Sequence, residues 1–253
     1  MTYSQAVVVI VALLIPVQLS AQANERDQRA LMILTQTINA AGGVDLLNGI
    51  HDFTGTGTIT YYWDEEVHGT VTVKGSGTTR FRLDASLSGG MKSTVIKNGT
   101  GFLKERDGTI SVVPFGPHLI VLPYAELVDA LNEPAIGVTY IGLVKHHGRF
   151  SHHIQVRHER VPRSGRAPAN GPKTDYYIDP YTFLISNVVE AAAPGASSLV
   201  HNSQETELAD YHLVAGILAP FSITKRAHGQ RLLSMNLTEF LFNQNVANDD
   251  FKP

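Results

Sequence analysis

Five of the eleven histidines lie close together in the segment HHGRFSHHIQVRH, residues 146–158. Imidazole nitrogens gathered in this way could bind zinc. If residues 148–150 form a three-residue hairpin loop, His146 and His152 face each other across two strands, while His153 points to the opposite face. Two histidines are one short of the three protein ligands that a catalytic zinc site needs. We therefore expect surface histidines around a turn and no metal site.

Two glycine-rich stretches, GTGT at residues 55–58 and GSGTT at residues 75–79, resemble phosphate loops in their glycine content. Neither opens a helical pattern, so neither offers a helix N-terminus to a phosphate. The sequence contains no G-x-S-x-G motif, no H-E-x-x-H motif and no cysteine, which removes the common signatures of serine, zinc and thiol hydrolases. We predict no catalytic residue, no cofactor and a non-enzymatic protein.

Composition places the chain among ordinary folded proteins. It has 253 residues, a net charge of −3, 17% charged residues and 43% hydrophobic residues. A charge so close to neutral gives no electrostatic footprint for nucleic acid, so we expect no nucleic-acid partner.

The N-terminus has the pattern of a secretory signal. Residues 6–17 are an unbroken apolar run, too short for a bilayer span of about 20 residues, and Ala21-Gln22-Ala23 fits an A-x-A cleavage site. No lysine or arginine precedes the run, and a short uncleaved anchor is the alternative. We expect residues 1–23 to be a cleaved signal peptide and residues 24–253 to be one half-barrel, lipid-binding-like domain, soluble in the periplasm.

Two helices are predicted. Residues 26–41 place Leu31, Leu34 and Ile38 on one face at helical spacing, and Gly42-Gly43 ends the pattern. Residues 119–131 favour a second helix that starts near Pro123.

The remainder alternates with period two, as half-buried strands do. Residues 53–113 predict an antiparallel meander of about six strands, with hairpin turns at Asn98-Gly99 and Asp107-Gly108. A strand pair over residues 138–159, a loop over 160–173, a hairpin turning at Asp179-Pro180 and three final strands follow. The total of about eleven strands and two helices indicates a mainly β (α+β) fold with helices on one face of a curved sheet.

The last 80 residues carry a family resemblance. In order they contain Asp179-Pro180 before a turn, Asp210-Tyr211, Gly216, then Pro220 four residues later, and Phe251 before a terminal proline. This arrangement resembles the bacterial lipoprotein localisation factor superfamily, the periplasmic carriers and outer-membrane receptors of lipoproteins. The resemblance implies an unclosed antiparallel half-barrel, helices over its concave face, and an apolar cavity for acyl chains. Pro220 would then lie at an edge, a strand start or a bulge.

The candidate cavity follows from the strand faces. The apolar residues of the first three strands share one face and would cover the helix over residues 26–41; they are Ile59, Tyr61, Trp63, Val71, Val73, Phe81 and Leu83. Their pattern fits an ordinary core as well as a ligand cavity. Leu31, Leu34 and Ile38 would belong to a lid helix.

The leading functional hypothesis is a non-enzymatic periplasmic carrier or sensor for lipidated or other apolar ligands in the bacterial envelope, with lipoprotein sorting as one form of that role. Its partners would be a lipid or the acyl chain of a lipoprotein, with envelope membrane proteins as further partners, and we expect a monomer. The alternative is an envelope protein-interaction module with a filled core and no ligand.

Overall fold

The computed structural model of the protein describes residues 26–62, 65–114, 121–158, 173–190 and 204–253. The predicted signal segment, Trp63 and most of the predicted loop over residues 160–173 lie outside these ranges. The described helices are α1 (Gln28–Ala41), α2 (Val44–Asn48), α3 (Tyr124–Asn132) and the 3-10 helix η1 (Asn248–Phe251). The described strands are β1 (Asp52–Tyr62), β2 (Glu66–Ser76), β3 (Arg80–Leu87), β4 (Gly90–Lys97), β5 (Thr100–Lys104), β6 (Ile110–Pro114), β7 (Ile136–His146), β8 (Arg149–His158), β9 (Lys173–Ile178), β10 (Ile185–Glu190), β11 (Gln204–Val214), β12 (Ile217–Ala227) and β13 (Gln230–Phe242).

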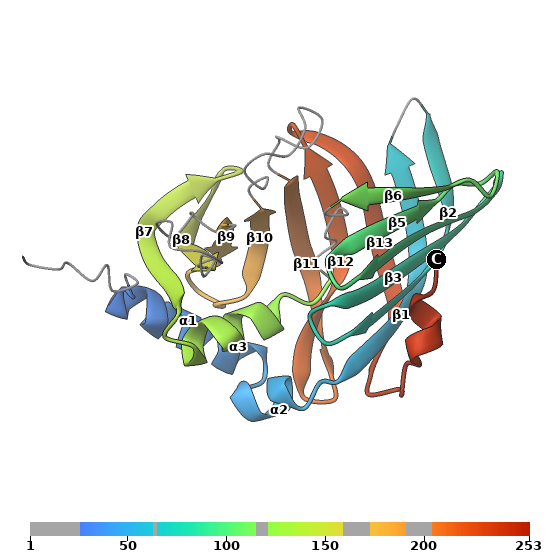
Figure 1. Cartoon of the computed structure of the whole chain (residues 1–253). Helices are drawn as coiled ribbons and strands as arrows, with labels where there is room; N and C mark the ends of the chain where they lie inside the picture. Colours follow the sequence, from blue (N-terminus) through green and yellow to red (C-terminus); the bar gives the residue numbers. More distant parts are fainter. Residues whose placement is uncertain (1–25, 63–64, 115–120, 159–172, 191–203) are drawn as a thin grey trace, which may run out of the picture.

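All thirteen strands belong to one antiparallel sheet, in the order β6-β5-β4-β3-β2-β1-β13-β12-β11-β10-β9-β8-β7 (Figure 1). Pairing of β1 with β13 joins two meanders, and β6 and β7 are the two edges of the unclosed sheet. The predicted mainly β half-barrel is therefore confirmed, and so is the six-strand meander over residues 53–113. The sheet has thirteen strands rather than about eleven, with short members such as β9 and β10 of six residues each.

Pro220 lies where the sheet tolerates it. It pairs in register with Tyr211 of β11, whereas the pairing of β12 with β13 begins only at Ser222. The strand has one partner at this point, so a residue without an N–H group removes no hydrogen bond toward β13.

The helices lie on the concave side, toward the β7–β12 part of the sheet (Figure 1). Helix α1 packs mainly against α3, β7 and β12. The sequence predicts that the apolar face of β1–β3 covers the apolar stripe of α1. This prediction is wrong, because the curvature of the sheet places β7 and β12 against the helix. The second helix begins at Tyr124, directly after Pro123, which confirms the predicted start near Pro123.

Arg26 joins the two long helices. Its guanidinium donates hydrogen bonds to the carbonyl oxygens of Ala130 at 3.0 Å and Leu131 at 2.9 Å, and also to that of Glu133. These carbonyls belong to the last turn of α3 and the residue after it, where the helix itself supplies no donors. One side chain ahead of α1 therefore caps the C-terminus of α3.

Two glycines fix the point where α1 meets the sheet. Gly42 ends α1 with φ of 137°, and a Cβ on it would lie 2.7 Å from the carbonyl oxygen of Gly216, in the turn between β11 and β12. Gly43 follows with φ of 93°, but no atom lies within 4 Å of the position of its Cβ. Backbone conformation thus constrains both glycines, and close approach constrains Gly42 alone.

This difference gives a matched pair of variants. Gly43→Ala introduces backbone strain alone, of about 1–3 kcal/mol. Gly42→Ala introduces the same kind of strain and also an overlap with the carbonyl oxygen of Gly216, a backbone atom that cannot swing away as the end of a side chain can. We therefore expect Gly42→Ala to lower the free energy of unfolding by at least about 1 kcal/mol more than Gly43→Ala does. Urea denaturation of both variants measures the difference. Equal losses would show that α1 does not approach the β11–β12 turn as closely as described.

Candidate functional site

The predicted cavity residues share one face of the sheet. Ile59, Tyr61, Val71, Val73 and Leu83 are buried in the same core as Leu34 and Ile38 of α1, while Phe81 and Leu31 are partly buried and pack against it. The strand set and the helix set therefore belong to one continuous apolar core, although α1 itself packs mainly against α3, β7 and β12. Among them, Phe81 also borders a pocket in the part of the chain that the structure describes.

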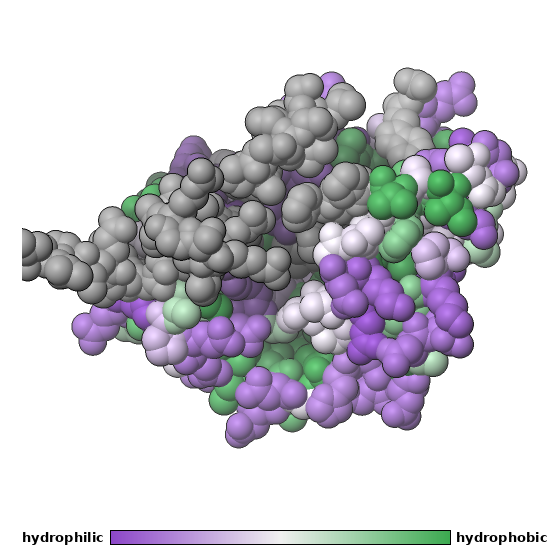
Figure 2. All heavy atoms as spheres, in the orientation of Figure 1, coloured by the Kyte–Doolittle hydropathy of each residue, from purple (hydrophilic) through white to green (hydrophobic). Residues whose placement is uncertain are grey.

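This pocket, of about 160 Å³, lies between the β1–β4 strands and the segment that enters α3. Figure 2 shows apolar atoms in the hollow between the helices and this part of the sheet. Its apolar lining comes from three strands and from the start of the helical segment: Phe53, Phe81, Ile96, Val121, Leu122 and Ala125. Its polar lining includes Arg80, Glu126 and Glu190.

The floor of the pocket is a cross-strand row. Phe53 pairs with Gly75, Gly75 with Phe81, and Phe81 with Ile96, across β1 to β4. A Cβ on Gly75 would lie 2.2 Å from the Phe53 ring, so glycine leaves the space in which that ring lies. Phe53 also stacks on Phe240 with ring centroids 5.3 Å apart. Phe53 and Ile96 continue the predicted period-two face, and extending the pattern by one row would have found them.

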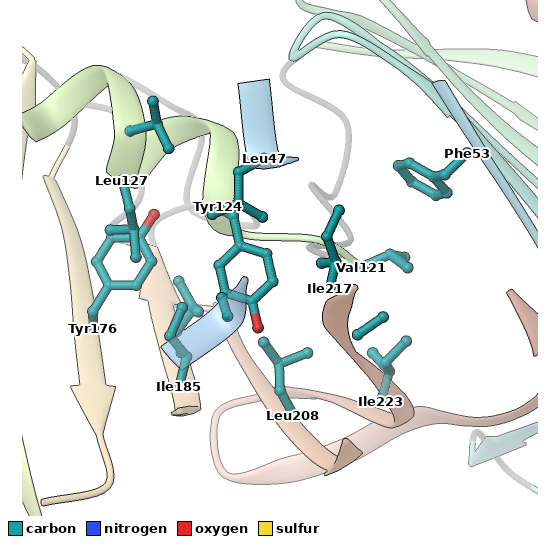
Figure 3. Packing of buried hydrophobic residues seen from close by; sticks show 14 of the residues in the cluster. Leu47, Phe53, Val121, Tyr124, Leu127, Tyr176, Ile185, Leu208, Ile217 and Ile223 are labelled. Carbon is teal, nitrogen blue, oxygen red and sulfur yellow. The ribbon is translucent and has the colours of Figure 1, made fainter. Parts of the chain in front are cut away.

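Glu126 attaches α3 to the sheet. Its carboxylate accepts hydrogen bonds from Tyr176 at 2.6 Å, His158 at 2.9 Å and Thr174 at 3.1 Å, all on β8 and β9. Figure 3 shows Tyr176 pointing from β9 toward α3. Tyr124, two residues before Glu126, donates to the carbonyl oxygen of Leu218 at 2.8 Å. The helix that borders the pocket is thus held by directional bonds on two sides.

These contacts shift two pKa values in opposite directions. Burial raises the pKa of Glu126, but the hydrogen bonds from His158, Tyr176 and Thr174 outweigh it, and the pKa lies below the ordinary 4.5. The bond to Glu126 holds the pKa of His158 above its ordinary 6.5, although burial opposes that shift. Near pH 6 the pair is therefore an ion pair.

Glu190, at the polar end of the pocket, interacts electrostatically with Lys225 of β12. Burial raises the pKa of Glu190 to about 7, although Lys225 of β12 lowers it. Burial also lowers the pKa of Lys225 to about 8, although Glu190 raises it. A carboxyl group that exchanges its proton near neutral pH can donate or accept a hydrogen bond at the pocket wall. No sequence pattern distinguished Glu126 or Glu190 from surface carboxylates, because their partners come from distant strands.

The histidine segment is arranged differently from the prediction. The turn contains two residues, His147 and Gly148, so His146 pairs with Arg149, and His152 pairs with Leu143. The expectation that His146 faces His152 is therefore wrong. His152 instead bonds through Nδ1 with the Tyr140 hydroxyl at 3.1 Å.

An unclosed β half-barrel with a helix-bordered interior defines the structural class of the protein. No protein-family model matches the sequence, and no curated protein matches it. Solved structures match in fold. A domain named for outer membrane lipoprotein sorting from Vibrio parahaemolyticus has a TM-score of 0.51 and 11% identity, over 88% of this chain and 96% of that one.

Two further structures are similar. A LolA superfamily protein from Nitrosomonas europaea has a TM-score of 0.53 and 8% identity, over 88% of this chain and 98% of that one. A DUF1329 family protein from Desulfovibrio piger has a TM-score of 0.50 and 6% identity, over 88% of this chain and 97% of that one. The resemblance to the lipoprotein localisation superfamily is thereby confirmed at the level of fold. No helix among the described residues is both long and apolar enough to cross a membrane.

The Glu126–His158 pair predicts a pH dependence of stability. Glu126 has a lowered pKa, so its contribution is complete above about pH 4.5 and is lost as the pH falls through its folded pKa. His158 has a raised pKa, so its contribution is complete below about pH 6.5 and is lost as the pH rises through its folded pKa. We expect His158→Gln, which keeps a neutral donor, to destabilise more at about pH 5.5 than at about pH 8.5.

Urea denaturation at both pH values measures this difference. His212→Gln is the control, because His212 and Asp210 form an exposed pair at 2.9 Å whose contribution should be small at either pH. A loss for His158→Gln that is equal at the two pH values, or larger at pH 8.5, would contradict the ion pair.

Proposed function

We propose that the protein is a non-enzymatic carrier or sensor that binds a lipidated or other apolar ligand between its sheet and its helices. The observation that carries this proposal is the pocket beside α3, whose floor is the apolar row of Phe53, Phe81 and Ile96. An apolar surface that is left accessible inside a curved sheet gains free energy when an acyl chain covers it. The proposal is supported by the fold shared with the lipoprotein-sorting domain and the LolA superfamily protein.

The lining suggests how such a ligand would lie. Its chain would extend over the aromatic row, under Val121 and Leu122. A hydroxyl, amide or amine group of the ligand would find the carboxyl group of Glu190 at the polar end. An amphiphile with a small polar head is the ligand class that uses both ends of the pocket.

The size of the pocket favours a second candidate function. Ligand pockets usually enclose about 300–1,000 Å³, whereas this pocket encloses about 160 Å³. An envelope protein-interaction module would have this kind of largely filled interior. For a carrier, the segment ahead of α3, Val121 to Pro123, would have to move away from the sheet as a chain enters.

Ala125 provides a test of the pocket. It lies on the exposed side of α3 and borders the pocket, so a phenylalanine ring at this position would fill the pocket without displacing core side chains. We expect Ala125→Phe to weaken binding of a fluorescent fatty acid about tenfold or more, with a small change in Tm, because surface substitutions usually change stability by about 0.5 kcal/mol or less. Fluorescence titration and thermal melting measure the two effects.

Asn132→Phe is the matched control, since it adds the same ring to an exposed position at the other end of α3. It should bind like the unmodified protein. If the unmodified protein takes up no fatty acid and carries no lipid when purified, the interaction module replaces the carrier. If Ala125→Phe binds with unchanged affinity, the ligand lies elsewhere and this pocket is the wrong site.

Location in the periplasm is part of the proposal and rests on the apolar run and the Ala21-Gln22-Ala23 sequence. We expect N-terminal sequencing of the protein from a bacterial envelope fraction to begin at Asn24. A chain that retains Met1 and stays with the membrane would contradict both the cleavage and the soluble state.

A further inference from the structure

The tip of the β7–β8 hairpin departs from the plane of its neighbours. The two-residue turn has φ of 44° at His147 and 83° at Gly148, and histidine is among the residues that tolerate this region. Within the described residues, β8 pairs with β9 only from His152 to Arg157. The end of the hairpin, including His146 and His147, is therefore free to fold over the sheet instead of extending it.

The tip folds onto the outer face. His146 stacks on the ring of Tyr177, with centroids 3.7 Å apart and planes 12° apart. Tyr177 lies between Tyr176 and Ile178 in β9, which are fully buried on the helix side. Because strand side chains alternate between faces, Tyr177 points to the side opposite the helices and the pocket.

Folding of the tip brings three metal-ligating groups together. The Nε2 atom of His146 lies 2.8 Å from Oε1 of Glu205, and Nε2 of His147 lies 2.9 Å from the same oxygen and 3.1 Å from Oε2. The three ligand atoms lie within 4.8 Å of one another. Glu205 is on β11, and three strands separate it from β7 in the sheet, so neither strand pairing nor sequence spacing accounts for the convergence.

Neighbouring side chains fix two of these groups. Asn187 on β10 donates a hydrogen bond to Oε1 of Glu205 at 2.8 Å. The ring of Tyr177 stacks against one face of the His146 ring. The side chains of His146 and Glu205 are only 20% and 15% exposed, whereas that of His147 is 56% exposed. Outer contacts that orient ligands in this way are typical of metal sites, and the exposed His147 leaves a path from solvent.

We propose, against the sequence-based expectation of no metal site in this segment, that His146, His147 and Glu205 form a binding site for a divalent cation of the zinc class. Two imidazoles and one carboxylate are a ligand set that zinc takes in proteins, with a fourth position left for water. Zinc–ligand bonds of about 2.0–2.1 Å in a tetrahedron place ligand atoms roughly 3.3 Å apart. The two separations between an imidazole nitrogen and Oε1 of Glu205, 2.8 and 2.9 Å, need to widen by a few tenths of an ångström, and the two imidazole nitrogens, which lie within 4.8 Å of each other, have to settle at the same spacing. The cation would replace the protons that the two imidazoles now share with Glu205.

A cation here would fasten the hairpin tip to β11. It would act on the outer face, away from the pocket, so the site does not depend on the proposed carrier function. Without a cation, the three residues would join the hairpin tip to β11 by hydrogen bonds alone. Stoichiometric metal binding distinguishes a cation site from such a hydrogen-bonded contact.

The test uses the full-length gene product, purified without a polyhistidine tag, treated with chelator, and titrated with Zn²⁺ by calorimetry. We expect one equivalent to bind, and the visible absorption of the Co²⁺-loaded protein to have the intense bands of tetrahedral coordination. Zn²⁺ at about 100 times its Kd should raise Tm by about 5–10 °C. Absence of stoichiometric binding would overturn the proposal.

Variants assign the ligands. His147→Asn keeps a residue that tolerates the left-handed turn, and Glu205→Gln keeps the shape of the side chain. Each should weaken zinc binding at least about tenfold and abolish the zinc-dependent rise in Tm, while Tm without zinc stays within a few degrees. His212→Ala, which removes an imidazole from a separate histidine–carboxylate pair, should bind zinc normally. Equal binding by all three variants would place the metal elsewhere and refute the site.

Discussion

The carboxylate of Glu126 is the interaction on which the arrangement of the interior depends. It accepts three hydrogen bonds from β8 and β9, and a partly buried carboxylate is costly unless it is satisfied in this way. Fixing Glu126 fixes the first turn of α3, and Arg26 binds the last turn of the same helix. Helix α1 then packs against α3, and Gly42 at its end meets the β11–β12 turn. The position of Glu126 therefore determines where α3 lies, and through α3 it determines where α1 lies.

The unclosed sheet creates the space that this layer only partly fills. A closed barrel pairs its edges, whereas here β6 and β7 remain apart and the helices approach from the β7–β12 side. Figure 3 shows Tyr124 reaching from α3 toward the strand that carries Leu208, and Phe53 standing farther off on β1. The pocket lies at this seam, between a helix held by polar contacts and strands whose glycines make room for aromatic rings. An apolar ligand that enters between α3 and these strands would displace fewer packed side chains than one that enters the filled core.

The two faces of the same strands carry different chemistry. On β9, Thr174, Tyr176 and Ile178 face the helices, while Asp175 and Tyr177 meet histidines on the outer face. Alternation along a strand separates the two sets by the thickness of the sheet. Ligand binding inside and cation binding outside can therefore belong to one chain without sharing a side chain, and they are connected only through the strands themselves.

The sequence by itself determined the local elements. Alternation and the Asn98-Gly99 and Asp107-Gly108 turns predicted the β1–β6 meander, helical spacing with two glycines predicted α1, and the shared apolar face was identified except for its last row. These features depend on residues a few positions apart. Only the tertiary structure decided which strands α1 covers, that Glu126 lies against Tyr176, and that His146 meets Glu205 rather than His152. Each of these contacts joins residues about 50 or more positions apart, and their geometry follows from the curl of the sheet and the length of one turn, which periodicity does not specify.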